Sequence, residues 1–170
     1  VKSSTMEEHE MHAEWIDIEI ELIRQLSRNN TKKTIAVGTT SLRTLESLYW
    51  MGFKALLNPN ATITDLEVEQ WDPYKKYLQI ASTKEALNAL LVWMQKNKLN
   101  KLLCRTRILI APPYQLKMSD GIITNFHQPQ STLLLLISAI VGSEWKTIYN
   151  YALNNNFRFL SYGDSSLLLV

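Results

Sequence analysis

The stretch GIITNFHQPQSTLL, residues 121–134, decides the expected fold. It begins with an apolar segment typical of a buried strand and continues into a polar tip that carries Asn125 and His127. After Pro129 it enters an apolar helix that begins near Ser131. In an open α/β sheet, such a strand–loop–helix unit places polar side chains and free backbone N–H groups at the carboxyl edge, where ligands bind. The stretch therefore predicts one side of a ligand site.

A second unit of the same design precedes it. Residues 34–37 form a short apolar run, 38–41 read GTTS, and 41–51 carry leucines at helical spacing, with Gly52 predicted to end that helix. Two such units predict a site built from two loops on one edge of a sheet. The fold class we expect is α/β, with a mostly parallel sheet and flanking helices.

Composition and charge restrict the class of protein. The 170 residues are 46% hydrophobic and 20% charged, which permits a globular core, and the formal net charge is only +2. This charge argues against a strongly basic nucleic-acid binder but allows a local basic patch. The lone Cys104 excludes an internal disulfide and fits a cytoplasmic setting. The apolar run 133–141 is shorter than the ~20 residues of a membrane span, so we expect a helix buried on all sides.

Further elements follow from periodicity and capping signals. We expect strands at 15–20, 63–68, 107–111, 121–125 and 157–160, and helices at 20–29, 83–97, 131–141 and 144–155. Ser82 or Thr83 is expected to cap the helix at 83–97, and Gly142 to end the one at 131–141. The chain begins with Val1 rather than methionine, and we expect either a fragment of a longer protein or a processed chain.

Several polar groups allow both a chemical and a structural interpretation. His9 and His12, with Glu10 and Glu14, invite a metal site, but the histidines are three apart rather than the four of a zincin helix. A polar segment leading into a strand and an acid/base pair are the alternatives.

The other candidates are equally open. The turn 38–41 at a helix start either binds an anion or simply caps the helix. Arg43 and Glu46 either face a ligand or form a solvated pair. His127 is either a proton acceptor or a structural histidine, and Asp164 is either a turn carboxylate or a ligand contact.

Four blocks together resemble one family. EEHEMHAE (7–14), AVGTTSLRTLES (36–47), ITNFHQPQSTL (123–133) and FRFLSYGD (157–164) resemble S-adenosylmethionine:tRNA ribosyltransferase-isomerase, in the family's order. The resemblance covers roughly 1–50 and 105–166 and corresponds to the carboxyl-terminal half of the family's chain. It implies a single α/β catalytic-domain fragment at 1–170, without the family's inserted β-barrel domain and with a helical insertion at about 53–104.

The resemblance also implies an activity. The ribosyl part of S-adenosylmethionine is transferred to the 7-aminomethyl-7-deazaguanine wobble base of tRNA and isomerised, giving epoxyqueuosine-tRNA, adenine and methionine. S-adenosylmethionine is a substrate there, and no cofactor or metal is expected. The partners implied are the tRNA anticodon stem-loop and the amino-terminal half of the same protein, in a cytoplasmic monomer without membrane attachment. The isolated fragment is expected to be inactive.

Residue roles carried over from the resemblance are expectations. The catalytic set is His127, His12, Glu14 and Asp164, with either histidine as base, Glu14 orienting it, and Asp164 or Glu46 assisting adenine departure. The substrate-binding set is Gly38, Thr39, Thr40, Ser41, Arg43, Glu46, Asn125 and Tyr162, with the turn and Arg43 holding the methionine carboxylate. The rival interpretations are a non-catalytic tRNA-docking or scaffolding module and an ordinary nucleotide-binding α/β enzyme.

Overall fold

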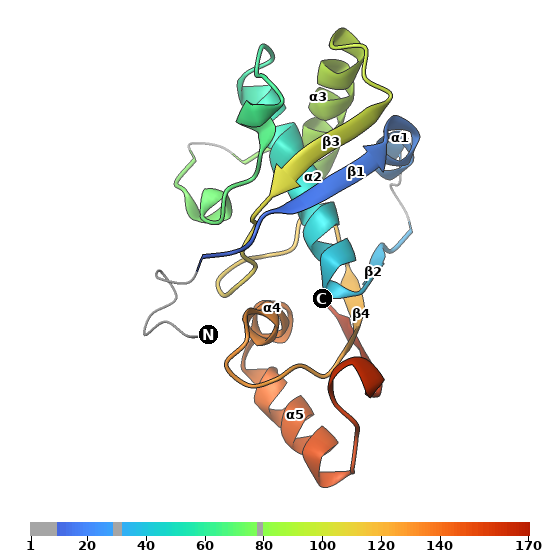
Figure 1. Cartoon of the computed structure of the whole chain (residues 1–170), viewed down its shortest axis with the longest axis vertical. Coiled ribbons are helices and arrows are strands. Elements are labelled where there is room, and N and C mark those ends of the chain that lie inside the picture. The colour runs from blue at the N-terminus through green and yellow to red at the C-terminus, as the bar shows by residue number, and fades with distance from the viewer. Residues whose placement is uncertain (1–9, 29–31, 78–79) are drawn as a thin grey trace. The chain divides into compact units, whose positions relative to one another are not determined.

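A computed structural model describes residues 10–28, 32–77 and 80–170 of the chain, apart from the side chain of Tyr162. Its strands are β1 (Glu14–Glu19), β2 (Ile35–Val37), β3 (Lys101–Thr106), β4 (Gly121–Asn125) and β5 (Ser165–Leu169). Its α-helices are α1 (Ile20–Arg28), α2 (Thr39–Leu57), α3 (Thr83–Lys96), α4 (Thr132–Val141) and α5 (Trp145–Asn154). Short 3-10 helices are η1 (Thr64–Leu66), η2 (Asp72–Tyr74), η3 (Gly142–Glu144) and η4 (Leu160–Tyr162) (Figure 1).

The chain forms two compact units. Unit 1 comprises Val1–Glu10, Lys33–Arg43 and Leu109–Val170, and unit 2 comprises Met11–Lys32 and Thr44–Ile108. The first turn of α2 belongs to unit 1 and the rest of that helix to unit 2. Whether the chain is a single domain with an insertion at 53–104 stays a prediction.

Unit 1 is built on a three-stranded sheet in the order β2-β4-β5. β2 and β4 are parallel, with Val37 opposite Ile123, whereas β5 runs antiparallel to β4, with Ser165 opposite Asn125. The chain can form the β2–β4 pair in parallel because α2 and the unit 2 segment Thr44–Ile108 lie between these strands in sequence. Aromatic rings of Phe126 and Tyr149 meet edge to face, 5.4 Å apart, beside this sheet.

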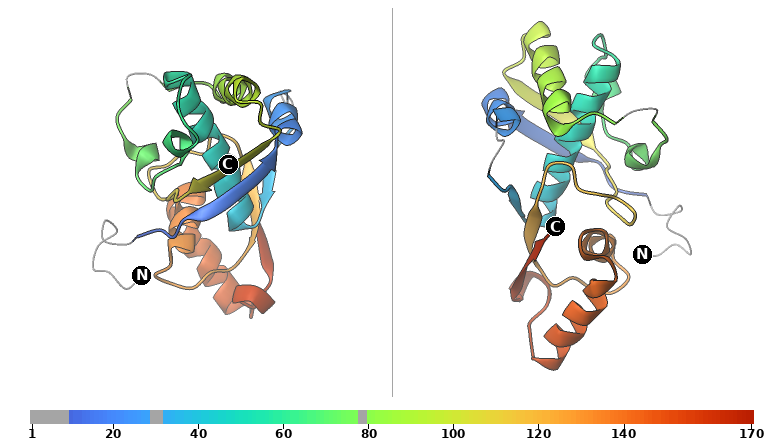
Figure 2. Two further views of the ribbon diagram at one scale, coloured as in Figure 1. Left: turned by 45° about the horizontal axis from the view of Figure 1, so that its top comes forward. Right: turned by 180° about the vertical axis from the view of Figure 1, so that it is seen from behind.

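Unit 2 packs helices on a two-stranded antiparallel ladder. β1 pairs with β3 from Glu14–Thr106 to Glu19–Lys101, and α1 packs against α3 (Figure 2). The core comes chiefly from α2 and α3, whose largest fully buried side chains include Trp50, Tyr49, Phe53, Leu87, Leu90 and Met94. A capping box fixes the start of α3, because the Ser82 hydroxyl accepts from the Glu85 N–H and the Glu85 carboxylate accepts from the Ser82 N–H.

The expectation of a mostly parallel sheet was wrong. Of the three ladders among the described residues, only β2–β4 is parallel. The expected strand at 157–160 is absent, and the apolar chain end that follows it instead forms β5 against β4. Alternation of apolar residues predicts a strand but not its direction, which depends on the route of the connecting chain.

Two further boundaries differ from expectation. The strand expected at 107–111 lies at Lys101–Thr106, because the ladder with β1 ends at Thr106 and the Arg107 N–H donates to Val68 O instead. Within the strand expected at 63–68, Thr64–Leu66 forms η1 instead, because the Asp65 carboxylate accepts from Thr62 and stabilises a turn. Only Val68 makes a β-bridge, a single parallel one to Thr106.

Gly52 does not end a helix, as the sequence suggested. It lies inside α2, and a Cβ at this position would lie 2.2 Å from the carbonyl oxygen of Ala86. The glycine therefore allows α2 to approach the backbone of α3 closely.

α4 is less buried than the sequence predicted. Only Leu136 and Ile137 are buried, and its other residues are half-buried. By length and composition alone, the run Thr132–Asn154 is apolar enough to cross a membrane, which is weak evidence for a span.

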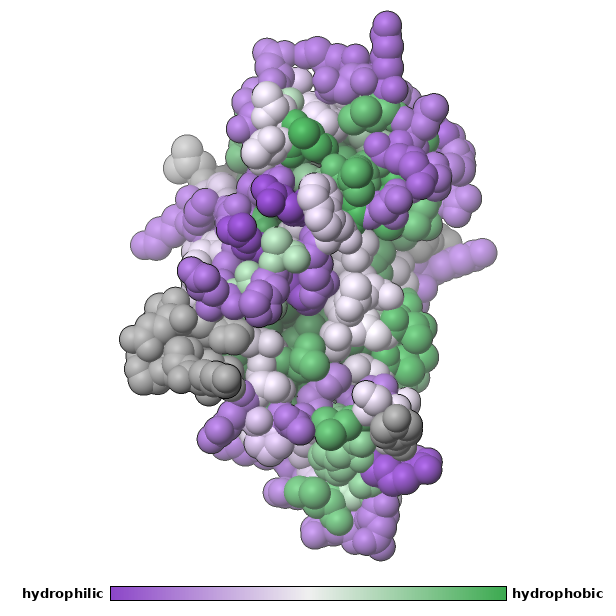
Figure 3. Space-filling model, viewed as in Figure 1, coloured by the Kyte–Doolittle hydropathy of each residue, from purple (hydrophilic) through white to green (hydrophobic). Residues whose placement is uncertain are grey.

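Gly142, with φ 58°, ends α4 as predicted, and α5 leaves in a different direction (Figure 1). Apolar side chains also reach the surface over α5 (Figure 3).

Candidate functional site

Three segments meet at one edge of the sheet in unit 1. The parallel register places the turn after β2 beside the loop after β4, and the Gly38 N–H extends the ladder by donating to Ile123 O at 2.8 Å. Because β5 is antiparallel to β4, the residues just before Ser165 lie at the same edge. The prediction of two loops on one edge is confirmed, and the turn 160–164 is a third segment that the sequence pattern did not place there.

The turn at Gly38 leads directly into α2. Gly38 has φ 87°, which favours glycine, and its carbonyl accepts from Leu42 N–H as the helix begins. Thr40 and Ser41 are exposed, and Gly38 and Thr39 are half-exposed. α4 begins at the same edge, where the Ser131 hydroxyl caps the Leu134 N–H at 3.3 Å. Two helix N-termini with their positive dipole ends therefore lie at an edge suited to an anionic group.

Asn125 ties the edge together. Its amide donates to Leu160 O at 3.0 Å and to Gly163 O at 3.5 Å, so the strand end of β4 holds the turn that precedes β5. Tyr162 belongs to η4 within this turn, but its side chain lies outside the described part of the structure. Asn125 is therefore a structural element of the edge as well as a candidate ligand contact.

His127 is fixed from both its backbone and its ring. Its N–H donates to the Tyr149 hydroxyl at 3.0 Å, and its Nε2 lies 3.0 Å from the Thr124 hydroxyl. The side chain is buried, and this burial lowers the pKa of the imidazole. The ring is therefore neutral at pH 7, which is the state that can accept a proton.

Asp164 has a definite structural partner. Its carboxylate accepts from the Arg158 N–H at 2.8 Å and from Arg158 Nη2 at 2.9 Å. The hydrogen bond from the Arg158 side chain lowers the pKa of Asp164. An ionised carboxylate accepts hydrogen bonds but has no proton to donate at neutral pH.

Arg43 and Glu46 are buried, not solvated. Arg43 is 7% exposed in unit 1, and Glu46 is fully buried in unit 2. The interpretation as a solvated surface pair was therefore wrong, since neither side chain is exposed to solvent. Glu46 also contributes, after burial itself, to raising the pKa of Tyr49 to about 12.

His12 and Glu14 belong to unit 2, so the structure does not place them beside the edge in unit 1. His12 is exposed just before β1, and Glu14 is the half-buried first residue of that strand. His9 lies outside the described residues. Among those that are described, no group of three His, Cys, Asp or Glu side chains is arranged to hold a metal.

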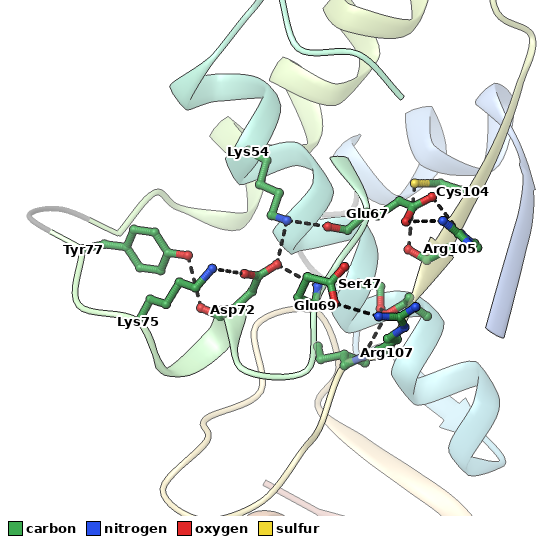
Figure 4. Close-up of polar contacts among 12 residues, drawn as sticks. Ser47, Lys54, Glu67, Glu69, Asp72, Lys75, Tyr77, Cys104, Arg105 and Arg107 are labelled. Atoms are coloured by element: carbon green, nitrogen blue, oxygen red, sulfur yellow. Dashed lines mark hydrogen bonds and ion pairs between the residues drawn. The ribbon is translucent and has the colours of Figure 1, made fainter. Parts of the chain in front are cut away.

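A polar network in unit 2 escaped the sequence pattern (Figure 4). Asp72 is 1% exposed, and its carboxylate binds Lys54 Nζ and Lys75 Nζ, each at 2.6 Å, and accepts from the Glu69 N–H at 2.8 Å. Although burial opposes ionisation, these hydrogen bonds lower the pKa of Asp72. The network joins α2 to the segment around η2. Its only signal in the sequence was the Asp72-Pro73 pair, which is typical of a turn.

The same region holds Arg105 and Cys104 of β3. Arg105 pairs in bidentate fashion with Glu67, at 2.8 and 2.9 Å, and also lies over the Trp15 ring. Burial raises the pKa of the Cys104 thiol to about 11, so it is not a nucleophile at neutral pH. These contacts have a structural role in unit 2.

The fold and the polar edge define the class of protein: an α/β domain with a candidate ligand site where strand ends and helix starts meet. The family model for queuosine biosynthesis protein matches residues 1–168. The chain belongs to this family, as the resemblance predicted. The matched range includes 53–104, and the proposal that this segment is an insertion stays untested.

Individual relatives agree with the family. The chain is 32% identical to S-adenosylmethionine:tRNA ribosyltransferase-isomerase of Halothermothrix orenii and 33% identical to that of Legionella pneumophila strain Corby, each over 99% of this chain and 38% of the relative. The crystal structure of S-adenosylmethionine tRNA ribosyltransferase from Thermotoga maritima is similar, with a TM-score of 0.58, 25% identity, and coverage of 91% of this chain and 40% of that one. The chain thus spans under half the length of these relatives.

Proposed function

We propose that this chain is the part of a tRNA ribosyltransferase-isomerase that holds S-adenosylmethionine for ribosyl transfer. The reaction is the one implied by the resemblance: the ribosyl group passes to a 7-aminomethyl-7-deazaguanine wobble base and is isomerised, with release of adenine and methionine. S-adenosylmethionine serves as a substrate, no metal or other cofactor is assigned, and the setting is cytoplasmic. The convergence of three segments at one edge of unit 1 carries the proposal, together with membership of the family.

His127 is the proposed base. The positive sulfonium acidifies the neighbouring C5′–H, and a neutral imidazole can accept that proton. Burial keeps His127 neutral, the Thr124 hydroxyl orients the ring through Nε2, and the Tyr149 hydroxyl holds the His127 backbone. The Thr124 hydroxyl can stabilise the protonated ring only if Nε2 carries a hydrogen and donates it to that hydroxyl. The incoming proton must then bind to the other ring nitrogen, so we assign proton acceptance to Nδ1.

The anionic end of the substrate suits the other side of the edge. We assign the methionine carboxylate to the turn at Gly38–Ser41, where first-turn N–H groups of α2 lack helical partners. Arg43 follows in the same helix and adds positive charge. Asn125 and Tyr162 are also assigned to substrate binding.

Departure of adenine needs hydrogen bonding at its ring. Asp164 is assigned to binding the adenine, as an acceptor from its amino group, because its ionised carboxylate has no proton to give to the leaving ring. Glu46 is fully buried in unit 2, so the contact with adenine is assigned to Asp164 alone. His12 and Glu14 stay the alternative base and its orienting group.

The half-buried α4 supports a role for the rest of the protein. An apolar helix with only two fully buried residues needs more cover than unit 1 supplies. We propose that the amino-terminal half found in the longer relatives supplies it, in a monomeric protein. The isolated chain is then inactive. The rival is a non-catalytic tRNA-docking module.

Adenine release tests the proposal. The full-length protein that carries this chain should release adenine from S-adenosylmethionine only with tRNA that bears 7-aminomethyl-7-deazaguanine, and not with tRNA that bears guanine there. His127→Gln should lower the rate by at least ~10²-fold. Tight tRNA binding without any adenine release would instead support the docking module.

A further inference from the structure

A basic groove lies between α1 and α3, within unit 2. The two helices pack side by side (Figure 2). A concavity of about 340 Å³ opens between the end of α1 and the start of α3. Its lining residues are Arg24, Ser27, Arg28, Lys84, Asn88 and Leu91. None of them was assigned a role above, and all of them belong to unit 2.

The charges in the groove are unequally engaged. Arg24 pairs with Glu21 one turn away on α1. Arg28 and Lys84 are exposed, and across the described part of the chain no carboxylate forms an ion pair with either of them. The other nearby acid, Glu85, is held by the N–H and hydroxyl of Ser82 at 2.8 and 2.6 Å. The groove is therefore a positive site on a chain whose net charge is only +2.

This arrangement suits a phosphodiester backbone. Arg24 and Arg28 are one helical turn apart, with ~5–6 Å between their Cβ atoms, so they can contact neighbouring phosphate groups. A guanidinium binds phosphate through parallel hydrogen bonds, and Lys84 adds a point charge in the first turn of α3, where the helix dipole also favours an anion. Asn88 supplies a neutral polar group on the same wall.

We propose that the groove between α1 and α3 binds the phosphate backbone of the substrate RNA. This inference rests on the proposed function for the kind of RNA, a tRNA anticodon stem-loop, but not for the presence of the positive groove. It gives unit 2 a role in docking RNA, separate from the edge of unit 1 that is proposed to hold S-adenosylmethionine.

Binding of a labelled anticodon stem-loop to the full-length protein tests the proposal. Arg28→Gln and Lys84→Gln should each weaken binding about five- to tenfold at low salt and lower the salt-dependence slope by ~1. Lys76→Gln is the matched control, because it removes one exposed charge from the same unit away from the groove. It should leave both quantities nearly unchanged.

Three results would overturn the inference: no RNA binding by the unaltered protein, no effect of the two groove substitutions, or an equal effect of Lys76→Gln. The same variants are also tested for binding to phosphatidylserine vesicles. If the groove substitutions abolish vesicle binding and leave RNA binding unchanged, the inference is overturned in favour of a lipid surface. Adenine release separates this inference from the proposed function. Groove variants should raise the KM for tRNA and leave kcat intact, whereas absence of adenine release with normal RNA docking would reject only the proposed function.

Discussion

The close approach of α2 to α3 makes an unusual prediction for Gly52→Ala. At an exposed position inside a helix, this change stabilises by ~1 kcal/mol, because alanine is the better helix former. Here the new Cβ would lie 2.2 Å from Ala86 O and 2.6 Å from Ala86 C. Ordinary carbon contacts lie at ~3.5 Å, so the helix backbones must separate by ~1 Å. Backbone atoms, unlike a flexible side chain, cannot rotate away.

The net effect should be destabilising. Overpacking a core typically costs ~1–3 kcal/mol, and here the separation also loosens contacts around Leu87 and Leu90, so the upper half of that range applies. After subtracting the gain in helix propensity, we expect a loss of ~1–2 kcal/mol in the free energy of unfolding. Urea denaturation followed by circular dichroism measures it. Gln95→Ala, at an exposed position of α3, should change it by less than ~0.5 kcal/mol. A Gly52→Ala protein more stable than wild type would refute the close packing of these helices.

Three other predictions concern single side chains. Asp72→Asn should destabilise unit 2 by ~3 kcal/mol, since it leaves two lysines without their carboxylate. Because the pKa of Asp72 is lowered in the folded state, its contribution to stability is complete above the unfolded pKa of ~3.9 and is lost as pH falls through the folded pKa. In urea titrations, the difference in free energy of unfolding between wild type and variant should therefore shrink in acid. A difference that stays constant with pH would contradict this. Ser82→Ala should cost ~1 kcal/mol by removing the cap of α3, measured by thermal unfolding against exposed Thr40→Ala as a control; no change would argue against the capping box. Since burial lowers the pKa of His127, the acid limb of adenine release should fall below the ordinary histidine value of ~6.5, and a limb above 6.5 in a pH–rate profile would exclude His127 as the base.

The elements that the sequence predicted well are those with local signals. The capping serines at 82 and 131 and the positive-φ Gly142 mark helix ends by chemistry that acts within a few residues. Strand β4 and the polar tip after it were also found in place, because an apolar run that stops at Asn125 is a local pattern. These signals sufficed to predict that two loops share an edge.

What the sequence could not supply depends on distant contacts. Partners 18 to 40 residues away in sequence fix three features. Asn125 sets the direction of β5, Lys54 accompanies the burial of Asp72, and Ala86 lies against Gly52 within α2. Glycine inside an apolar helix pattern favours either a stop or a close approach, and only the position of Ala86 decides between them. For the same reason, the basic groove brings together α1 and α3 charges that are not neighbours in sequence.

Hydrogen exchange of the full-length protein with and without S-adenosylmethionine locates the donor site. We predict that the ligand slows exchange of backbone amides at 38–42, 125–131 and 160–164, the three segments that meet at the edge of unit 1, and leaves α1 and α3 unchanged. Protection confined to unit 2, or none at the three segments despite saturating ligand, would contradict the assignment of S-adenosylmethionine to this edge.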